Sequence, residues 1–407
     1  MPAGGTVEQK EERMQIIVIG GGAAGLMAAV TAAQNGASVT ILEQNDTAGK
    51  KLLATGNGKC NLTNIKQEPA YYRGSEPLFA WEVISAFPLS ETLRFFTRLG
   101  IYTRNKNGGL YPFSEQASAV RDVLRMEAEH LHVKLKTREH VQCIEKTGVF
   151  QVTTQSYTYH ADRVILAAGG AASNIAGSGM DGFHLAESLG HTIIKPLPAL
   201  VGLRGVGNYF SKWAGVRFEA SVTLYANDAS ILTERGEVQF TDYGISGIPV
   251  FQVSRFAARA LDEGQRVLAV LDFMPDFTVE ELLVFLETRQ EQCPYKTISE
   301  SLIGLFPQKL ISLFCTEIRT LAELAGKLKE FPVIIKGVHS MEQAQVTSGG
   351  VFTGEINAAT MESQKISGLY FAGEVVDVDG CCGGYNLQWA WSSGALAGKS
   401  SAAKEPL

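Results

Sequence analysis

The sequence predicts an α/β protein in which a parallel sheet is built from both ends of the chain and is interrupted by a β-rich and then a helical segment. Three observations predict this architecture. Residues 16–19 form a β-branched run, Ile-Ile-Val-Ile, typical of a strand buried on both faces of a parallel sheet. A run of the same type returns at Leu369–Ala372. Between them, after Lys195–Pro198, the pattern changes to short alternating strands and then to charged helices.

The first elements predict a βαβ unit. An alanine-rich helix is expected from Ala23 to Asn35, with Gly36 in the position that helix C-caps favour, and Ser38–Leu42 is the second strand. The other elements expected before residue 195 are two amphipathic helices within Glu76–Gly100, a turn at Asn107-Gly108, a helix over Ser118–Leu131, a meander over Val133–Arg163, a buried strand at Val164–Leu166 and a helix over Gly182–Gly190.

The central segment is expected to begin as a compact β domain. Strands are predicted at Ala220–Tyr225, Ser230–Thr233 and Glu237–Thr241, with turns at Asn227-Asp228 and Arg235-Gly236. A small helical cap is expected over Pro275–Glu330, a strand at Val333–Ile335, and a closing helix over Tyr385–Gly398. The length of 407 residues suits two or three domains.

Composition excludes several classes of protein. The chain has 36 Lys and Arg against 42 Asp and Glu, a net charge of −6, and no basic run longer than Lys50-Lys51. This balance argues against a protein that grips nucleic acid through its phosphates, so no nucleic-acid partner is expected. The six cysteines include no C-x-x-C pattern, which argues against a disulfide framework and a zinc site. We expect no metal, and we expect the protein to lie in the reducing cytoplasm.

The N-terminal region imitates a membrane segment. Met14–Ala33 carries no charge and is long enough to span a bilayer. Its glycines at 20, 21, 22 and 25 instead divide it into a short strand and a helix, and its flank is of mixed sign, unlike that of a signal peptide. We therefore expect no membrane partner, and we expect the first thirteen residues to be a disordered leader.

The pattern Gly20-x-Gly22-x-x-Gly25 lies between the first strand and the first helix, and Glu43 ends the next strand. In such a context Gly20 permits a tight turn, Gly22 lets a pyrophosphate approach the helix N-terminus, and Gly25 lets the helix pack closely on the strand. Glu43 is expected to accept both ribose hydroxyls and to disfavour a 2′-phosphate. The motif predicts the ADP moiety of FAD or NAD.

Two further strands favour FAD over NAD. Leu166–Gly170 and Gly368–Glu374 are both buried runs that end in glycine. Glu374 is placed to accept ribityl hydroxyls, and Gly383–Asn386 begins a helix whose N-terminus suits the flavin N1/C2=O region. Three strands that end in glycine, spread over the whole chain, therefore predict an FAD site.

The motifs Ala54–Asn64 and Gly373–Gly380, with the continuation Gly383–Ala390, resemble the BaiN-like flavoproteins, also described as the YhiN-type or aminoacetone-oxidase-type family. The resemblance covers Gln15–Gly398. It implies a two-dinucleotide-type, Rossmann-like FAD domain interrupted by a β-barrel-like domain and a small helical domain. The expected divisions are 14–195 and 348–407 for the FAD domain, 196–274 and 331–347 for the barrel-like domain, and 275–330 for the helical cap.

The resemblance also implies which residues contact FAD. They are Gly20, Gly22, Ala24, Gly25, Glu43, Gln44, Lys51, Thr55, Gly58, Lys59, Cys60, Asn61, Val141, Ala168, Gly169, Gly373, Glu374, Asn386 and Leu387. One motif departs from the family. Where members often have Phe-Thr-His-x-Gly-x-Ser-Gly-Pro, this chain has Phe240–Ile248 with Asp242 and Tyr243, so a role of that histidine does not carry over.

The expected function is an FAD-dependent oxidoreductase that passes hydride between flavin and a small-molecule substrate. The resemblance implies NAD(P)H-dependent reduction of conjugated C=C bonds of the bile-acid enone type, or alternatively oxidation of aminoacetone or related amines by O2. The acid-poor stretch Gly244–Val253 offers no strong anchor for an ammonium group, which favours the reductase. A different class, an RNA-modifying or non-catalytic FAD-binding protein, is disfavoured by the absence of a basic face.

Proton donors and thiols complete the site hypothesis. Asp242, Tyr243 and Tyr385 are candidate proton donors, with no catalytic residue singled out. Cys381-Cys382 lies beside the expected flavin, where we interpret it as a polarizable filler rather than a dithiol that exchanges electrons. No second dinucleotide fingerprint is present, so NADH or NADPH would bind transiently. The oligomeric state stays open.

Overall fold

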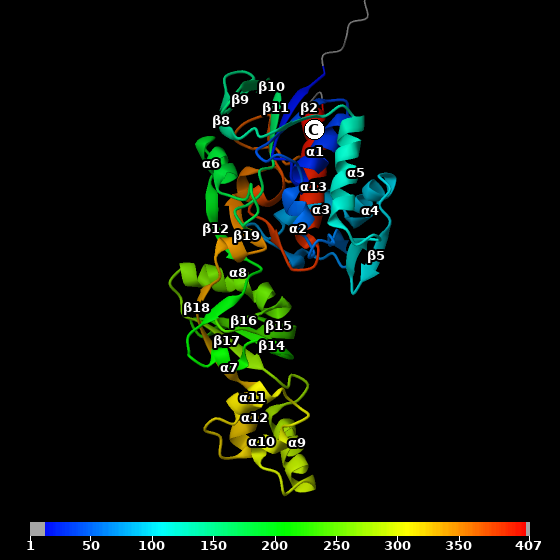
Figure 1. Ribbon diagram of the computed structural model, residues 1–407. Coiled ribbons are helices and arrows are strands. Elements are labelled where there is room, and N and C mark those ends of the chain that lie inside the picture. Colours follow the sequence, from blue (N-terminus) through cyan, green and yellow to red (C-terminus); the bar gives the residue numbers. More distant parts are fainter. Residues whose placement is uncertain (1–12, 404–407) are drawn as a thin grey trace, which may run out of the picture. The chain divides into compact units, whose positions relative to one another are not determined.

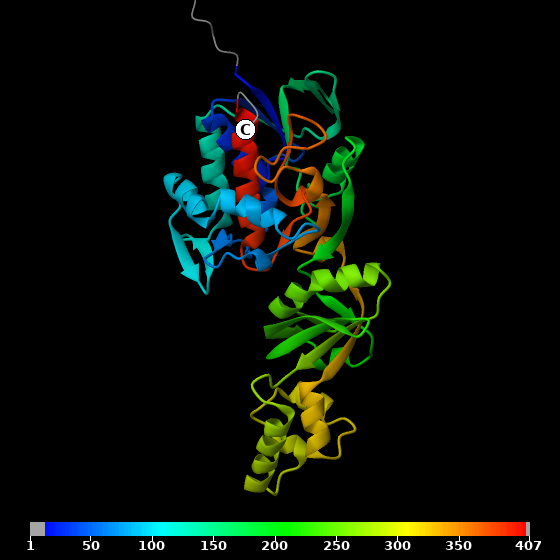
Figure 2. The ribbon, with the colours of Figure 1, turned by 180° about the vertical axis from the view of Figure 1, so that it is seen from behind.

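The computed structural model describes residues 13–403, and these form two compact units (Figures 1 and 2). Unit 1 contains the described residues up to 171, residues 175–196 and those from 349 onward. Unit 2 contains residues 172–174 and 197–348. The leader expected over the first thirteen residues lies, except for Arg13, outside the described residues. Within residues 13–403, none of the helices combines the length and apolar character needed to span a bilayer.

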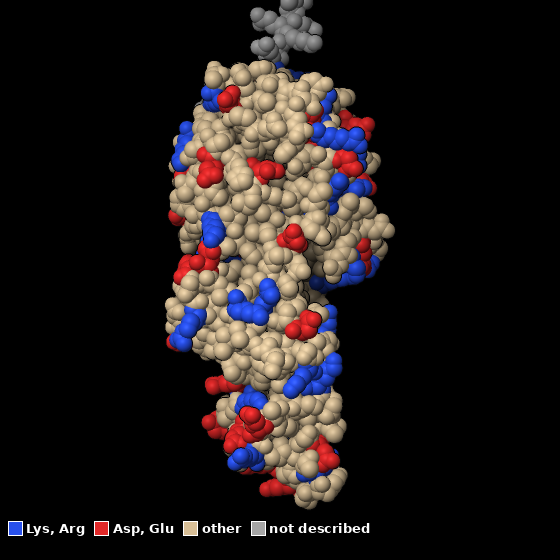
Figure 3. Space-filling view, turned by 60° about the vertical axis from the view of Figure 1, so that its left-hand side comes forward, with Lys and Arg blue, Asp and Glu red and all other residues tan. Residues whose placement is uncertain are grey.

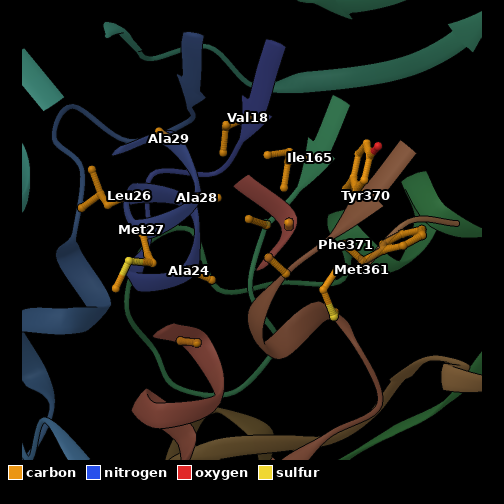
Figure 4. Packing of buried hydrophobic residues seen from close by; sticks show 14 of the residues in the cluster. Val18, Ala24, Leu26, Met27, Ala28, Ala29, Ile165, Met361, Tyr370 and Phe371 are labelled. Atoms are coloured by element: carbon orange, nitrogen blue, oxygen red, sulfur yellow. The ribbon is translucent and has the colours of Figure 1, made fainter. Parts of the chain in front are cut away.

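Unit 1 is organised around a five-stranded parallel sheet. Its order is β20 (Leu369–Phe371), β11 (Arg163–Leu166), β1 (Gln15–Ile19), β2 (Ser38–Glu43) and β7 (Lys134–Thr137). The C-terminal strand β20 pairs with β11, so both ends of the chain build one sheet, as predicted. The β-branched and aromatic side chains of the central strands are buried; Figure 4 shows Val18, Ile165 and Phe371 among them.

Two helices lie against each other beside this sheet, α1 (Ala23–Gln34) and α13 (Tyr385–Ala402). A Cβ atom added to Gly394 would lie 2.5 Å from the Ala24 carbonyl oxygen, and one added to Gly398 would lie 2.4 Å from that of Ala28. Only glycine permits this approach of two backbones. The same packing fixes the N-terminus of α13 relative to the fingerprint turn.

The remaining elements of unit 1 surround the sheet. They are α2 (Lys50–Ala54), β3 (Thr63–Asn64), η1 (Pro69–Tyr71), β4 (Tyr72–Arg73), α3 (Phe79–Ala86), α4 (Leu89–Arg98), β5 (Thr103–Lys106), β6 (Gly109–Pro112), α5 (Ala117–His130), β8 (Val141–Lys146), β9 (Phe150–Thr154), β10 (Thr158–Ala161), α6 (Asp181–Ser188), η3 (Thr353–Glu355), η4 (Gly373–Val375) and β21 (Asp379–Gly380). Strands β12 (Ile193–Ala199) and β19 (Val346–Val351) form a two-stranded sheet. The predicted helices, the turn at Asn107-Gly108 and the meander before β11 are all present.

Unit 2 is a closed six-stranded barrel that carries a group of helices. The barrel order is β13 (Leu203–Gly205), β16 (Gly244–Gly247), β15 (Ala229–Phe240), β14 (Arg217–Ala226), β17 (Val267–Asp272) and β18 (Phe331–Val338). Between β17 and β18 the chain forms α9 (Val279–Gln292), α10 (Ile298–Ser301), α11 (Gln308–Phe314) and α12 (Leu321–Lys329). Helices α9, α10 and α12 each begin at a threonine capping box, a local signal that ends the preceding loop.

Two predictions for this region are wrong. The expected turn at Arg235-Gly236 is absent, because β15 continues through both residues while they pair with Ser221 and Ala220 of the long strand β14. The segment after Gly247 was expected to contain only strands, yet it forms the helix α8 (Ile248–Asp262). Pro249 suits the first turn of a helix, and Val250, Val253 and Ala257 are buried at helical spacing.

Candidate functional site

The fingerprint turn has the geometry that its glycines predict. Gly20 adopts a φ of 99°, and its N–H donates to the Leu42 carbonyl oxygen at 2.9 Å. A Cβ atom on Gly25 would lie 1.9 Å from the Gly20 carbonyl oxygen, so the helix and the strand leave no room for a side chain. A Cβ atom on Gly22 would meet no protein atom within 4 Å. The backbone at Gly22 therefore faces open space, as an approaching phosphate requires.

Glu43 is buried and holds this turn. Its Oε2 accepts from the Gly21 N–H at 2.7 Å, and its Oε1 accepts from the backbone and side-chain N–H groups of Asn45, both at 2.8 Å. Three of the roughly four acceptor positions of a carboxylate are thus used. One further donor fits without rearrangement, so binding both ribose hydroxyls would require exchange of an Asn45 bond. The neighbouring Gln44 donates through Nε2 to the Gly177 carbonyl oxygen at 3.0 Å.

Lys51 and Glu374, which are distant in sequence, form an ion pair with 2.8 Å between Nζ and Oε2. Helix α2 is held beside the fingerprint turn because the Gly49 N–H donates to the Gly21 carbonyl oxygen at 2.8 Å. Glu374 lies in η4, directly after β20. The structure therefore brings together two residues that the family resemblance had named separately.

The loop from Thr55 to Asn61 is tightly coiled. The Thr55 carbonyl oxygen accepts from the Gly58 and Cys60 N–H groups at 3.1 and 2.9 Å, and Gly58 and Cys60 both have positive φ. The Oδ1 atom of Asn61 is buried and has no hydrogen-bond partner. A buried acceptor without a donor is costly, so this atom suits a ligand N–H group such as the flavin ring carries. Lys59 is exposed and pairs with Glu115 at 3.4 Å.

Three of the other predicted contacts, Ala168, Gly169 and Gly373, lie at the carboxyl ends of parallel strands. Ala168 and Gly169 follow β11, and a Cβ atom on Gly169 would meet no protein atom within 4 Å. Gly373 follows β20, and its N–H donates to Ser393 Oγ at 2.9 Å; Ala24 lies against it, since a Cβ atom on Gly373 would be 2.7 Å from that of Ala24. Val141 is buried at the start of β8.

Helix α13 begins at Gly384, in the left-handed region with φ of 100°. Asn386 accepts from the Gly380 N–H at 2.8 Å and donates to the Gly380 carbonyl oxygen at 2.9 Å, so its side chain holds the preceding loop; Leu387 is half-buried. Sequence reasoning did not single out Gln388, which is buried and bonds Thr63 Oγ1 at 2.6 Å and Thr92 Oγ1 at 2.8 Å. Its place within the motif Gly383–Ala390 was the available signal.

A group of tyrosines and cysteines lies near this helix start. Tyr385 stacks on Tyr71 with ring centroids 4.7 Å apart and meets Tyr72 edge-on at 5.8 Å. Burial raises the pKa of the Tyr385 hydroxyl, as do its neighbours Tyr71 and Cys381. Burial also raises the pKa of the Cys60 thiol to about 12 and that of the Cys382 thiol. These thiols are protonated at neutral pH, which supports the filler interpretation over electron exchange.

The other two candidate proton donors, Asp242 and Tyr243, lie in unit 2. The Tyr243 ring meets His339 edge-on with centroids 4.1 Å apart, and the Nε2 atom of His339 is buried without a partner. Burial, followed by the nearby Arg204, lowers the pKa of His339. No spacing motif in the sequence links this histidine to Tyr243. All predicted FAD contacts, in contrast, lie in unit 1.

Comparisons with known proteins identify relatives of this chain. The chain is 42% identical to a 3-dehydro-bile acid delta(4,6)-reductase of Clostridium scindens, over 92% of this chain and 95% of that protein. It is 30% identical to a ribosomal RNA dihydrouridine synthase of Haemophilus influenzae, over 90% of this chain and 92% of that protein.

A 3-ketosteroid delta1-dehydrogenase from Sterolibacterium denitrificans matches the fold with a TM-score of 0.50 and 12% identity, covering 96% of this chain and 100% of that one. Residues 14–400 match the family model described as HI0933-like protein Rossmann domain. The chain therefore belongs to the HI0933-like family of FAD-binding Rossmann proteins and is an FAD-dependent oxidoreductase.

Proposed function

We propose that this chain reduces C=C bonds conjugated to a carbonyl group, with FAD as its resident cofactor. The proposal rests on the reactions for which the two relatives are named, because both reactions reduce a C=C bond conjugated to a carbonyl group. A delta(4,6)-reductase of a 3-dehydro steroid and a dihydrouridine synthase act on very different molecules. In both molecules, however, a reduced double bond is conjugated to a carbonyl. In uracil and in the Δ4 bond of a 3-oxo steroid, hydride adds to the β-carbon and a proton adds to the α-carbon; in the Δ6 bond of a dienone, hydride adds to the δ-carbon at the far end of the same conjugated system.

Bound FAD would supply the hydride, as flavins do in such reductions. The residues that would hold it are those of unit 1. The open backbone at Gly22 and Gly169 suits the pyrophosphate and a close approach of the cofactor. The unpaired Asn61 Oδ1 suits a flavin N–H, and the N-terminus of α13 favours negative charge at the flavin N1/C2=O region.

The α-carbon requires a proton donor in its protonated form. Tyr111 of β6 is half-buried, and burial, followed by the neighbouring Cys382 and Cys60, raises the pKa of its hydroxyl. Tyr385 meets the same requirement but is buried. Tyr111 is therefore our first candidate. We expect Tyr111→Phe to lower the rate of substrate reduction about 100-fold, in the range typical of lost general-acid catalysis, and to leave reduction of the flavin unchanged.

The electron donor in this proposal is NADH or NADPH. Two other glycine-rich runs have similar spacing. Gly202-x-x-Gly205-x-Gly207 overlaps the short barrel strand β13 and opens no helix of Rossmann type. Gly177-x-Gly179-x-x-Gly182 leads into α6, but ten residues separate it from the end of β11, so it is not a strand–turn–helix fingerprint. A nicotinamide cofactor would therefore bind without a domain of its own and leave after transferring its hydride to FAD.

An anaerobic half-reaction experiment tests the proposal. NADH or NADPH is added to the FAD-loaded protein, loss of the oxidised-flavin absorbance is followed, and then a 3-oxo-Δ4 steroid, a uridine-containing RNA or oxygen is admitted. We expect bleaching by a nicotinamide and rapid reoxidation by a conjugated substrate. Bleaching by aminoacetone with no response to either nicotinamide would replace this proposal by the amine-oxidase alternative. A purified protein that binds no FAD would overturn both.

A further inference from the structure

A small antiparallel sheet of unit 1, in the order β3, β6, β5, divides its side chains between two faces. Lys106 lies opposite Gly109 and Arg104 opposite Tyr111, and the Phe113 N–H donates to the Tyr102 carbonyl oxygen at 2.7 Å. Residues that face each other, or that are two apart on one strand, share a face. One face, which we call the platform, therefore carries Tyr102, Arg104, Lys106, Tyr111 and Phe113. The alternate residues Leu110 and Pro112 are buried on the other.

The platform exposes large aromatic rings. Tyr102 is 74% exposed and Phe113 is 55% exposed, with ring centroids 5.5 Å apart. The Arg104 guanidinium lies 4.2 Å from the Phe113 ring centroid, and Lys106 Nζ lies 6.0 Å from that of Tyr111. Paired aromatic rings left in water and interleaved with cations are typical of surfaces on which planar groups stack.

The platform is also locally positive. Lys59, Arg104 and Lys106 all pair with the single carboxylate of Glu115, at 3.4, 3.0 and 2.6 Å. Three cations and one anion leave a local charge of +2, in a chain whose net charge is −6. Figure 3 shows one face of the molecule, on which Lys and Arg are interspersed with Asp and Glu. The local charge of the platform is therefore opposite in sign to the net charge of the chain.

One edge of the platform adjoins the expected flavin loop. The Leu62 N–H donates to the Leu110 carbonyl oxygen at 2.7 Å, directly after Asn61. A Cβ atom on Gly109 would lie 3.0 Å from the Asn61 amide and 3.1 Å from the Tyr111 ring. Tyr111 thus lies between the exposed aromatic pair and the residues expected to hold the flavin.

We propose that the platform binds single-stranded RNA, with bases stacked on Tyr102 and Phe113 and phosphates beside Arg104, Lys106 and Lys59. Aromatic side chains on a sheet surface are a recurring way to bind unpaired RNA bases, and lysine and arginine supply the phosphate contacts. A bile acid has one carboxylate, so it would leave the second uncompensated cation without a counter-ion, whereas successive phosphates of a nucleic acid supply several. The inference rests on the proposed reduction, because a uracil has the conjugated C=C bond.

Fluorescence anisotropy of a labelled, uridine-containing RNA oligonucleotide with the FAD-loaded protein tests this surface. We expect the double variant Tyr102→Ala/Phe113→Ala to bind at least 10-fold more weakly than the unmodified protein, in line with lost base stacking. Lys106→Ala should reduce the slope of log affinity against log salt by about one. The matched control is Tyr157→Ala, which removes an exposed tyrosine that pairs with Tyr159 at 6.2 Å elsewhere in unit 1 and should leave affinity unchanged.

Flavin content, read from the visible spectrum, separates failure of this inference from failure of the proposed function. All variants should keep FAD, because the substituted side chains are exposed to solvent. Equal RNA affinity of the platform variants and the unmodified protein would overturn the inference, as would an equal loss in Tyr157→Ala. So would an unmodified protein that holds FAD and a labelled bile acid yet binds no RNA at low salt.

Discussion

The two units differ in what they bury. Among the described residues, the buried carboxylates Glu43, Asp377 and Asp379 all lie in unit 1. The buried polar residues of unit 2 are serines and threonines alone, namely Ser246, Ser254, Ser301, Thr347 and Ser348. The core of unit 2 combines aliphatic side chains with a cluster of aromatic rings that includes Trp213, Phe240, Phe273, Phe314 and Phe331.

This difference indicates that the buried polar groups of unit 1 position its loops, whereas the core of unit 2 is stabilised by apolar packing. A buried carboxylate is expensive unless hydrogen bonds compensate it. Glu43 obtains them from the Gly21 and Asn45 N–H groups, and Asp377 from the Ser75 N–H at 2.9 Å and hydroxyl at 2.6 Å. Unit 1 thus devotes its polar groups to fixing loops at the ends of strands. Unit 2 gains its stability from the burial of apolar side chains. It also contains the motif with Asp242 in which this chain departs from the family.

The largest effect is expected where the backbone of unit 1 is most crowded. Gly25→Ala would place a methyl group 1.9 Å from the Gly20 carbonyl oxygen, so we expect a loss of stability of about 4 kcal/mol or more and loss of FAD. The control is Gly326→Ala in α12 of unit 2, where no protein atom lies within 4 Å; it should be neutral or stabilise by about 0.5–1 kcal/mol. Thermal melts and bound-flavin content measure both. Equal effects at the two glycines would contradict the distinction between the units.

The next largest effect concerns the core of unit 2. Phe273 stacks on Phe240 with centroids 5.7 Å apart and meets Phe314 at 4.7 Å. Removing its ring in Phe273→Ala should cost about 3–5 kcal/mol of unfolding free energy. FAD should nevertheless remain bound at low temperature, because its expected contacts lie in unit 1. Denaturant unfolding followed by circular dichroism and flavin absorbance measures the two quantities, with the exposed Tyr295→Ala as control. Parallel loss of FAD and of unit 2 structure would show that the units do not act separately.

A moderate effect is expected at the ion pair of the FAD site. Lys51→Met removes the ion pair from Lys51 to Glu374, and hydrogen bonds to charged groups contribute about 1.5–3 kcal/mol. We expect FAD to bind the apoprotein about 10-fold more weakly or worse, measured by calorimetric titration. Lys50→Met is the matched control, since Lys50 pairs at 2.8 Å with the exposed Asp46 on the same short helix region. If both variants bound FAD equally well, Lys51 would have no place in the site.

The smallest effect is a pH dependence of unit 1. His191 is buried, its Nε2 lies 2.8 Å from Ser363 Oγ, and burial lowers its pKa below the usual 6.5. The unfolded chain therefore binds this proton more readily than the folded one. The buried, neutral His191 side chain makes its full contribution to stability above pH 6.5. This contribution is lost as the pH falls through the lowered pKa of the folded state. His191→Asn should flatten the fall in melting temperature between neutral and acidic pH, whereas exposed His160→Gln should leave the slope unchanged. Identical slopes for His191→Asn and the unmodified protein would refute this.

The local sequence pattern was sufficient to predict the structure of short segments whose own residues favour one conformation. The run at Ile16–Ile19, the glycines at 20, 22 and 25, and Glu43 predicted a strand, a turn and a second strand that are all present. Three strands that end in glycine proved to be neighbours in one sheet, β20-β11-β1. Parallel strands share an edge for their carboxyl ends, so this juxtaposition followed once the strands were recognised.

Contacts between distant segments were beyond such reasoning. The turn expected at Arg235-Gly236 was wrong because pairing with β14 outweighs the local preference of glycine for turns. The contact of His339 with Tyr243 and the hydrogen bonds of Gln388 to Thr63 and Thr92 join segments with no common motif. The face shared by Tyr102, Arg104 and Phe113 required the register of β5 on β6.

The amino-acid sequence alone thus determined the α/β class, the FAD fingerprint and the family, because glycine spacing and buried β-branched runs act over a few residues. Tertiary structure was needed to pair Lys51 with Glu374, to leave Asn61 Oδ1 buried without a donor, and to gather aromatic and cationic side chains on one face beside that loop. Each of these depends on which distant segments meet and in what register, and that is decided by the packing of the whole unit rather than by local preference.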